Sequence, residues 1–194
     1  MADSTSIWTI GHSNHSFDTF IRGLAAERID FVVDVRSFPF SRFAPQYNQG
    51  ELKDALRDGG IRYLFLGAEL GGRPSREDHY DTDGHALYGP MSAEPSFQAA
   101  IGRLVRGAES HRLALLCSEA QPQHCHRRLL VGKVLAERGV MLRHILPDAT
   151  VVQEQVVTLE AGPDQPALFG GGPPTWRSTQ SVSRRRRLST SSAA

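Results

Sequence analysis

The sequence predicts an α/β fold: a single three-layer domain with a central, mostly parallel sheet of about five strands and helices on both faces. Short apolar segments alternate along the chain with segments whose apolar residues recur at helical spacing, and this alternation is typical of a parallel sheet. The chain has 194 residues, enough for one domain of ordinary size and a tail. Apolar residues make up 40% of it and charged residues 22%, as in globular proteins.

Local patterns predict the first two strands and the helix between them. Ile7–Ile10 is short, β-branched and aromatic, which favours a strand. Ser16 is suited to cap the following helix, whose apolar residues form one stripe. Phe31–Val35 begins with an unbroken apolar run, as expected of a strand covered on both faces. The stripe consists of Phe17, Phe20, Ile21, Leu24 and Ala25.

The next part of the chain predicts a helix, a strand and a long connection. Two prolines in residues 36–45 exclude a regular helix there. We expect the second helix from Gln49 to Asp58, because the glycine pair after it is a helix stop. Ile61–Leu66 reads as the third strand. Residues 67–92 have no clear period, so we expect a lid, a binding loop or a disordered segment.

The remaining elements complete the sheet. A helical stripe runs from Phe97 to Val105, and Leu113–Leu116 is the fourth strand. We expect a helix from Pro122 to Arg138 and a fifth strand at Val140–Leu146. Residues 151–159 suggest one further short element of uncertain type.

The composition changes near the C-terminus, and we divide the chain into an α/β domain, 1–160, and a tail, 161–194. From residue 162 the tail is rich in Gly, Pro, Ser and Arg, so we expect it to be disordered. The tail carries a formal charge of +4. Because the whole chain carries +1, the α/β domain carries −3. A domain with that net charge does not have the basic surface of a protein that coats nucleic acid. A weak polyanion contact through Arg184, Arg185, Arg186 and Arg187 stays open.

Membrane and export signals are not found in the sequence. No apolar run approaches the roughly 18 residues that span a membrane. The N-terminus lacks the basic-then-apolar pattern of a signal peptide. We therefore expect a cytoplasmic protein without a membrane partner, in which Cys117 and Cys125 are reduced thiols.

Polar residues follow each of the first four predicted strands. Ligands of parallel sheets bind beyond the carboxyl ends of the strands, so these residues predict one site at one edge. They are His12, Ser13 and Asn14 after the first strand, Asp34, Arg36, Ser37 and Arg42 around the end of the second, the loop 67–73 after the third, and Cys117, Ser118 and Glu119 after the fourth.

The richest of these segments, Leu113–Arg128, holds both cysteines. Cys125 is the better thiolate candidate by local sequence, because it lies at a predicted helix start between two histidines and before two arginines. Cys117 is either a nucleophile or a small buried residue that ends a strand. The spacing between the two cysteines is neither that of a thioredoxin-like redox pair nor that of a zinc motif, so we assign no metal site.

Roles follow from residue chemistry. The arginines suit a phosphate, sulfate or carboxylate group, and Asp34 is expected to be buried beside one of them. Glu119 lies on the site loop and suits a general acid or base, a role that His12 shares. The catalytic candidates are Glu119, Cys117, Cys125 and His12, and the substrate-binding candidates are Ser13, Asp34, Arg36, Ser41, Arg42, Gly71, Gly72, Arg73, His126 and Arg127.

Four motifs in this order resemble the bacterial and archaeal family called domain of unknown function 488. The resemblance covers Ile7 to Leu146 and implies the same fold and site, while it leaves the reaction open. The motifs are Gly11-His12-Ser13, Asp34-Val35-Arg36 with Pro39 and Ser41-Arg42, Leu66-Gly67 with Leu70-Gly71-Gly72, and Leu116-Cys117 with Glu119, Pro122 and Cys125-His126-Arg127.

The layout is also similar to that of rhodanese-like sulfurtransferases, which carry an Asp-x-Arg segment at one strand end and a cysteine at another. Asp34-Val35-Arg36 and Cys117 occupy comparable places. Here, however, the loop after Cys117 contains Glu119, whose carboxylate would oppose an anionic persulfide.

Three functions are therefore compatible with the sequence. The first is an enzyme that acts on an anionic small molecule or nucleotide-like substrate at the carboxyl edge of the sheet. The second is a non-catalytic module that binds a nucleotide or nucleic acid, and the third is rhodanese-like sulfur transfer. The residues name no cofactor.

Overall fold

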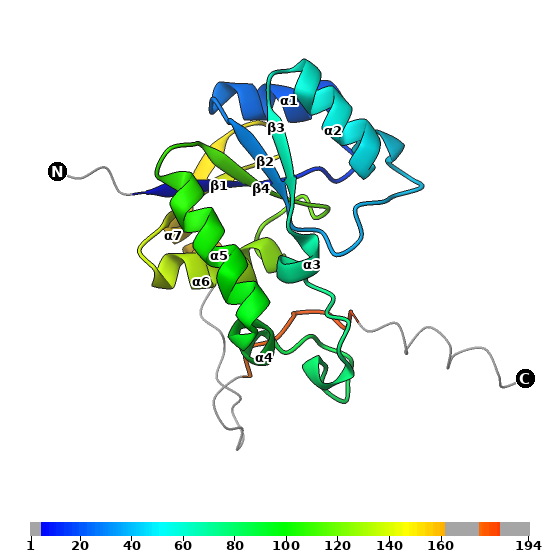
Figure 1. The fold of residues 1–194 in the computed structure, drawn as a ribbon, viewed down its shortest axis with the longest axis vertical. Coiled ribbons are helices and arrows are strands. Elements are labelled where there is room, and N and C mark those ends of the chain that lie inside the picture. The colour runs from blue at the N-terminus through cyan, green and yellow to red at the C-terminus, as the bar shows by residue number, and fades with distance from the viewer. Residues whose placement is uncertain (1–4, 162–174, 183–194) are drawn as a thin grey trace, which may run out of the picture.

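A six-stranded sheet forms the centre of the protein in the computed structural model, which describes residues 5–161 and 175–182 (Figure 1). The strand order is β3-β2-β4-β1-β5-β6. The first five strands are parallel and β6 pairs antiparallel with β5, which confirms a mostly parallel sheet. The strands are β1 (Ser6–Gly11), β2 (Phe31–Asp34), β3 (Arg62–Phe65), β4 (Leu113–Cys117), β5 (Met141–Ile145) and β6 (Val151–Gln153).

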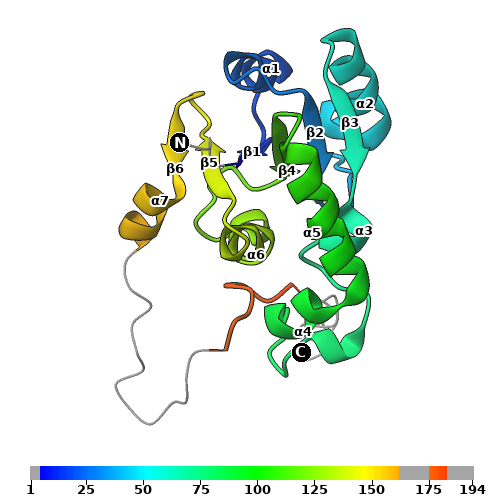
Figure 2. The same ribbon diagram turned by 60° about the vertical axis from the view of Figure 1, so that its left-hand side comes forward.

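Helices cover both faces of the sheet, as the sequence predicts (Figure 2). On one face lie α1 (Phe17–Ala26) and α2 (Gln49–Asp58), whose buried leucines pack on the side chains of β1, β2 and β4. On the other face lie α5 (Pro95–Ala108), the π-helix η3 (Arg127–Gly132) and α6 (Lys133–Glu137). Alternate side chains of β4 enter the two cores, which explains why all five of its residues are buried.

The first helix shows how local sequence sets an element. The hydroxyl of Ser16 accepts a hydrogen bond from the backbone N–H of Thr19 and so caps α1. Phe20 and Leu24 lie on the predicted stripe and are buried.

The long connection 67–92 is ordered and contains three short helices: α3 (Gly67–Leu70), the 3-10 turn η2 (Glu77–His79) and α4 (Tyr88–Ala93). Their buried residues extend the core beyond the carboxyl end of the sheet, where Leu70, Tyr88 and Met91 pack with α5. The segment therefore forms one wall of the region in which a ligand is expected.

The helix expected from Pro122 begins later, so that prediction is wrong at its start. Residues 121–124 form a turn in which the Cys125 N–H donates to the carbonyl of Pro122, and η3 starts at Arg127. A proline is tolerated only in the first turn of a helix. Here Pro122 lies in the turn that precedes the helix. Cys125 thus lies at the junction of turn and helix.

The connections that leave β1 and β4 go to opposite faces of the sheet. β1 leads into α1 on one face, whereas its neighbour β4 leads into η3 and α6 on the other. This is a topological switch point, and a crevice opens there between the two strand ends. His12 follows β1 and Cys117 ends β4, so both lie beside that crevice.

Part of the expected tail is described and contacts the domain. The indole N–H of Trp176 donates to the carbonyl of Leu129, and its ring meets the ring of Tyr88 edge-on at 5.9 Å between centroids. Residues 151–161 form β6 and α7 (Glu154–Ala161), which resolves the element of uncertain type. The expected disorder of residues 162–174 and 183–194, with the four-arginine run, lies outside the described residues, and the boundary at residue 160 stays a prediction.

The described helices include none that combines the length and the apolar character needed to cross a membrane.

Candidate functional site

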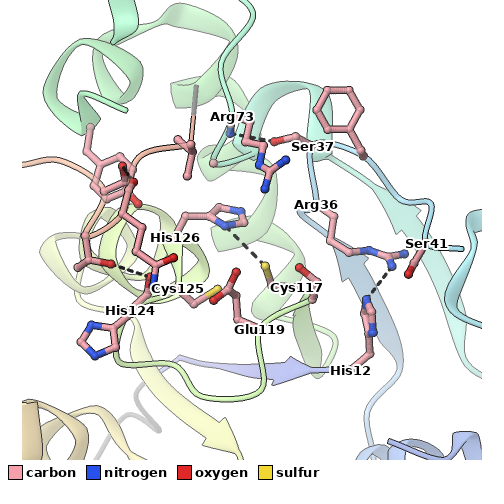
Figure 3. Close-up of a pocket in the computed structure, with 18 of the residues that line it drawn as sticks. His12, Arg36, Ser37, Ser41, Arg73, Cys117, Glu119, His124, Cys125 and His126 are labelled. Atoms are coloured by element: carbon pink, nitrogen blue, oxygen red, sulfur yellow. Dashed lines mark hydrogen bonds between the residues drawn. The ribbon is translucent and has the colours of Figure 1, made fainter. Parts of the chain in front are cut away.

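A cavity of about 330 Å³ opens at the carboxyl ends of β1, β2 and β4 (Figure 3). The loops after these strands form most of its wall, and α4 and the segment Ser178–Val182 complete it. Several predicted site residues come together here, as the rule of strand ends implies. They are His12, Arg36, Ser41, Gly72, Arg73, Cys117, Glu119, Cys125 and His126.

Cys117 and His126 form a pair in this wall. The Nδ1 atom of His126 lies 3.6 Å from Sγ of Cys117, and its Nε2 lies 2.9 Å from the carbonyl oxygen of Val35. A carbonyl only accepts, so Nε2 carries the hydrogen and Nδ1 presents its lone pair to the sulfur when the ring is neutral. Gly72 makes room for the ring, because a Cβ there would lie 2.6 Å from it.

The two cysteines differ in acidity in the opposite sense to the prediction. A hydrogen bond from Cys125, with the charge of His126, lowers the pKa of Cys117 well below its ordinary value. Burial and the negative charge of Cys117 raise the pKa of Cys125 well above it. These directions favour Cys117 over Cys125 as the thiolate, and the preference for Cys125 from local sequence took no account of burial or of the second sulfur. Burial lowers the pKa of His126, but the Cys117 sulfur outweighs it and the net shift is upward.

The thiols and the imidazole make a compact set of soft donors. Sγ of Cys117, Sγ of Cys125 and one ring nitrogen of His126 all lie within 4.8 Å of one another. The cysteines are buried and the histidine is partly buried, and all three line the cavity. Their spacing in the sequence gave no sign of this arrangement.

Arg36 is held by a buried network at the end of β2. Its Nε and Nη2 donate to the two carboxylate oxygens of Asp34, at 2.9 and 2.6 Å, and the hydroxyl of Tyr63 donates to the same carboxylate. Asp34 is fully buried and does not line the cavity, and its carboxylate holds the guanidinium of Arg36. The prediction that Asp34 pairs with an arginine is confirmed.

His12 is a positioning residue in this geometry. Its Nδ1 donates to the carbonyl of Ser13, and its Nε2 accepts from Nη1 of Arg36 at 3.0 Å. Burial lowers the pKa of His12, which favours the neutral ring that this pattern requires. The ring also stacks on Tyr47, with 4.4 Å between the centroids. Both ring nitrogens are engaged in these contacts, and the role of His12 as acid or base stays a prediction.

Arg127 also has a role other than the predicted one. Its side chain is fully buried, and its guanidinium donates to the carbonyls of Glu119 and Ala120 and to the hydroxyl of Thr9. These contacts hold the loop after β4 on β1. Gly11 permits this close approach, because a Cβ there would lie 1.7 Å from the carbonyl oxygen of Glu119. Arg127 therefore supports the loop after β4 and does not line the cavity.

Two charged side chains of the cavity are exposed. The carboxyl group of Glu119 and the guanidinium of Arg73 make no hydrogen bond or ion pair with other residues of the described part of the chain. The backbone N–H of Arg73 donates to Ser37 Oγ at 2.9 Å, which fixes the start of that arginine. Figure 3 shows both side chains pointing into the cavity.

Some predicted residues do not line the cavity. Arg42 is exposed and lies over the ring of Phe43, Gly71 packs against Ser37, and Ser13 supplies only its carbonyl to His12. Conversely, the catalytic and substrate-binding candidates left out residues that do line the cavity, two of which, Ser37 and Ser118, were predicted only as strand-end residues of the site. The omitted residues are Ser37, Phe38, Phe40, Tyr88, Ser118, His124 and four from the C-terminal segment, Ser178, Thr179, Gln180 and Val182. Phe38 and Phe40 are unusually exposed. The signal in the sequence that could have found them is a pair of aromatic residues in a polar loop that contains proline.

The fold and the cavity define an α/β domain with a cavity at a switch point of its sheet. A sequence profile of the family described as "Domain of unknown function DUF488" matches residues 16–134, more than half of the chain. The chain belongs to this family. A comparison with curated proteins and one with solved structures gave no match.

Proposed function

We propose that the protein is an enzyme that acts on a small anionic substrate bound in this cavity. One observation carries the proposal: the guanidinium of Arg73 and the carboxyl of Glu119, which have no partner among the described residues, open into the same cavity as the Cys117–Cys125–His126 cluster. Cation, proton-transfer group and reactive donors at one strand edge are the parts that an active site needs.

Anion binding is assigned to Arg73 and Arg36. Arg73 brings a full fork of donors, none of which has a partner in the described part of the chain. Arg36 uses three of its five N–H bonds on Asp34 and His12, which leaves one on each terminal nitrogen. Because Asp34 fixes that guanidinium, it is preorganised for a phosphate or carboxylate oxygen.

Glu119 is assigned the proton transfer. It is exposed on the loop that Arg127 holds, and its carboxyl points into the cavity. A carboxylate at a fixed position can take a proton from a nucleophile and return it to a leaving group.

The aromatic side of the cavity favours a substrate with a planar ring. Phe38 and Phe40 line it and expose 52% and 72% of their surface. Exposed aromatic faces beside an arginine suit stacking of a nucleobase while the guanidinium binds the phosphate. We therefore extend the proposal to nucleotide-like substrates.

The test is ligand-induced thermal stabilisation with phosphate, sulfate and nucleoside monophosphates as probes. The wild-type Tm should rise with the probe, and Arg73→Ala should lose most of the rise. Arg42→Ala is the matched control, because Arg42 is an exposed arginine of the neighbouring loop that does not line the cavity. Equal stabilisation of all three proteins would overturn the site assignment. A second measurement distinguishes an enzyme from a non-catalytic binding module. An enzyme should convert a bound probe to product, and the Glu119→Gln variant should not.

A further inference from the structure

We propose that Cys117, Cys125 and His126 bind one zinc ion per chain, with the fourth coordination position facing the cavity. Two sulfurs and an imidazole nitrogen are donors that favour zinc among the common divalent ions. The donors come from three places that are each fixed by the fold: the end of β4, the turn before η3, and the first residue after that turn.

The distance between two of the donor atoms already matches a metal site. Zinc bonds of about 2.3 Å to sulfur and about 2.0–2.1 Å to nitrogen give a tetrahedral edge of about 3.6 Å between the two ligand atoms. The distance from Sγ of Cys117 to Nδ1 of His126 is 3.6 Å. Since all three donor atoms lie within 4.8 Å of one another, small side-chain rotations suffice to close the site.

The surroundings of His126 are those of a metal ligand. A histidine that binds a metal through one nitrogen commonly donates its other N–H to a carbonyl or carboxylate. The carbonyl of Val35 takes this role at 2.9 Å and leaves Nδ1 for the metal. Gly72 leaves the space that the ring occupies, because a Cβ there would lie 2.6 Å from it, so a larger residue at this position would change the ring's orientation.

The number of donors separates a catalytic from a structural site. Structural zinc sites are closed by four protein ligands, whereas catalytic sites have three and an open position. In the described part of the chain no fourth side-chain donor belongs to the group. All three donors line the cavity, so the open position is reached from the side where substrate binds.

The reaction class follows if the proposed function holds, and this step rests on it. A water molecule at the open position loses a proton to Glu119, and its oxygen forms a bond to an electrophilic carbon or phosphorus of the substrate. The leaving group departs with the bonding electron pair and receives the proton from Glu119. The balance is that of a hydrolysis, with water as the only co-reactant.

The first test is the metal content of the untagged, reduced full-length chain after addition of zinc and removal of the excess. We expect one zinc ion per chain. With cobalt in its place, we expect thiolate-to-cobalt charge-transfer absorption and the visible bands of a tetrahedral ion. Zinc should also protect both cysteines from alkylation. A folded wild-type chain that takes up no stoichiometric zinc and shows no protection would overturn the proposal without any variant.

Variants then assign the ligands. Cys117→Ser, Cys125→Ser and His126→Asn should each weaken zinc binding by at least about 100-fold. His124→Asn is the matched control, because His124 is the neighbouring histidine of the same cavity wall and is outside the donor group. Glu119→Gln should also keep its zinc. Loss of zinc in either control would contradict the three-ligand site.

The two proposals fail separately. Zinc binding with no effect of Arg73→Ala on anion stabilisation would refute the proposed function and leave the metal site intact. Anion stabilisation that depends on Arg73 in a chain that never binds zinc would refute the metal site alone.

Discussion

Asp34 and Arg36 form a buried bidentate ion pair at the end of β2, with 2.6 Å between Oδ2 and Nη2. The two side chains expose 0% and 4% of their surface. If one partner were removed, water would therefore not solvate the charge of the other. The pair joins the core of the sheet to the cavity, because the same guanidinium meets His12 and faces the ligand space.

Replacing Asp34 tests this pair. Asp34→Asn should lower the free energy of unfolding by about 3–5 kcal/mol, since it leaves the Arg36 charge buried without a counter-charge. Urea denaturation at neutral pH measures the change. Asp58→Asn is the control, because Asp58 is 79% exposed and a surface ion pair of this kind contributes at most about 1 kcal/mol. Equal losses in the two variants would contradict a special role for the buried pair.

Gly72→Ala should disturb the site more than the fold. A Cβ at this position would lie 2.6 Å from the His126 ring, so the ring must move away from Cys117. We expect zinc affinity to fall by about 10–100-fold, the effect of disturbing a ligand's orientation. Gly50→Ala is the control, because a Cβ at Gly50 meets nothing within 4 Å. A Gly72→Ala protein with wild-type zinc affinity would show that the ring has room.

Thiol reactivity should follow the order that the structure gives. In reduced, zinc-free protein, Cys117 should react with iodoacetamide faster than Cys125. Its lowered pKa keeps it in the thiolate form as the pH falls below the ordinary thiol pKa, whereas the raised pKa of Cys125 keeps that thiol protonated. Peptide mapping of the alkylated chain at several pH values measures both rates. Faster labelling of Cys125 at neutral pH would reverse the assignment.

Glu154 should make stability depend on acid pH. Burial raises the pKa of this carboxyl, but hydrogen bonds from His144 and Arg128 outweigh it and the net shift is downward. A carboxyl with a lowered folded-state pKa stabilises the protein above its unfolded pKa, and the contribution is lost as the pH falls through the folded value. Glu154→Gln should therefore cost about 1–3 kcal/mol at pH 7. The difference from wild type should shrink in acid, and a constant difference would contradict the linkage.

Trp176→Ala should release the C-terminal segment from the domain. The indole hydrogen bond to Leu129 and the contact with Tyr88 would both be lost. Trypsin should then cleave after Arg177 at a higher rate, because the open state becomes more populated. Cleavage at the same rate as in the wild-type chain would mean that the indole does not hold the segment. Cleavage after Arg76, which lies in a different loop, serves as the internal reference.

The sheet and most of its helices could be predicted from the sequence because their signals are local. The stripe of α1 and the unbroken apolar run of β2 each specify an element without reference to the rest of the chain. The rule of strand ends then brought His12, Arg36 and Cys117 to one edge.

The side-chain partners could not be predicted in this way. The contact between Cys117 and His126 depends on a turn and a π-helix that shift the start of the helix after β4. The order of the two thiol pKa values depends on the hydrogen bond from Cys125 to Cys117 and on the charge of His126, neither of which the spacing reports. The contacts of Trp176 could not be predicted because the composition around it is that of a tail, although its indole packs against the core and donates to the carbonyl of Leu129.

Arg127 has a consequence for ligand binding. Its buried guanidinium donates hydrogen bonds to the carbonyl oxygens of Glu119 and Ala120 and to the hydroxyl of Thr9. Movement of the loop after β4 would break these bonds and leave a buried cation without solvation, which costs free energy. A loop held in this way loses little conformational entropy when a substrate arrives. We therefore expect a substrate to bind to a preorganised site. The heat capacity change of binding should reflect the surface buried in the contact alone, with no contribution from the folding of a loop.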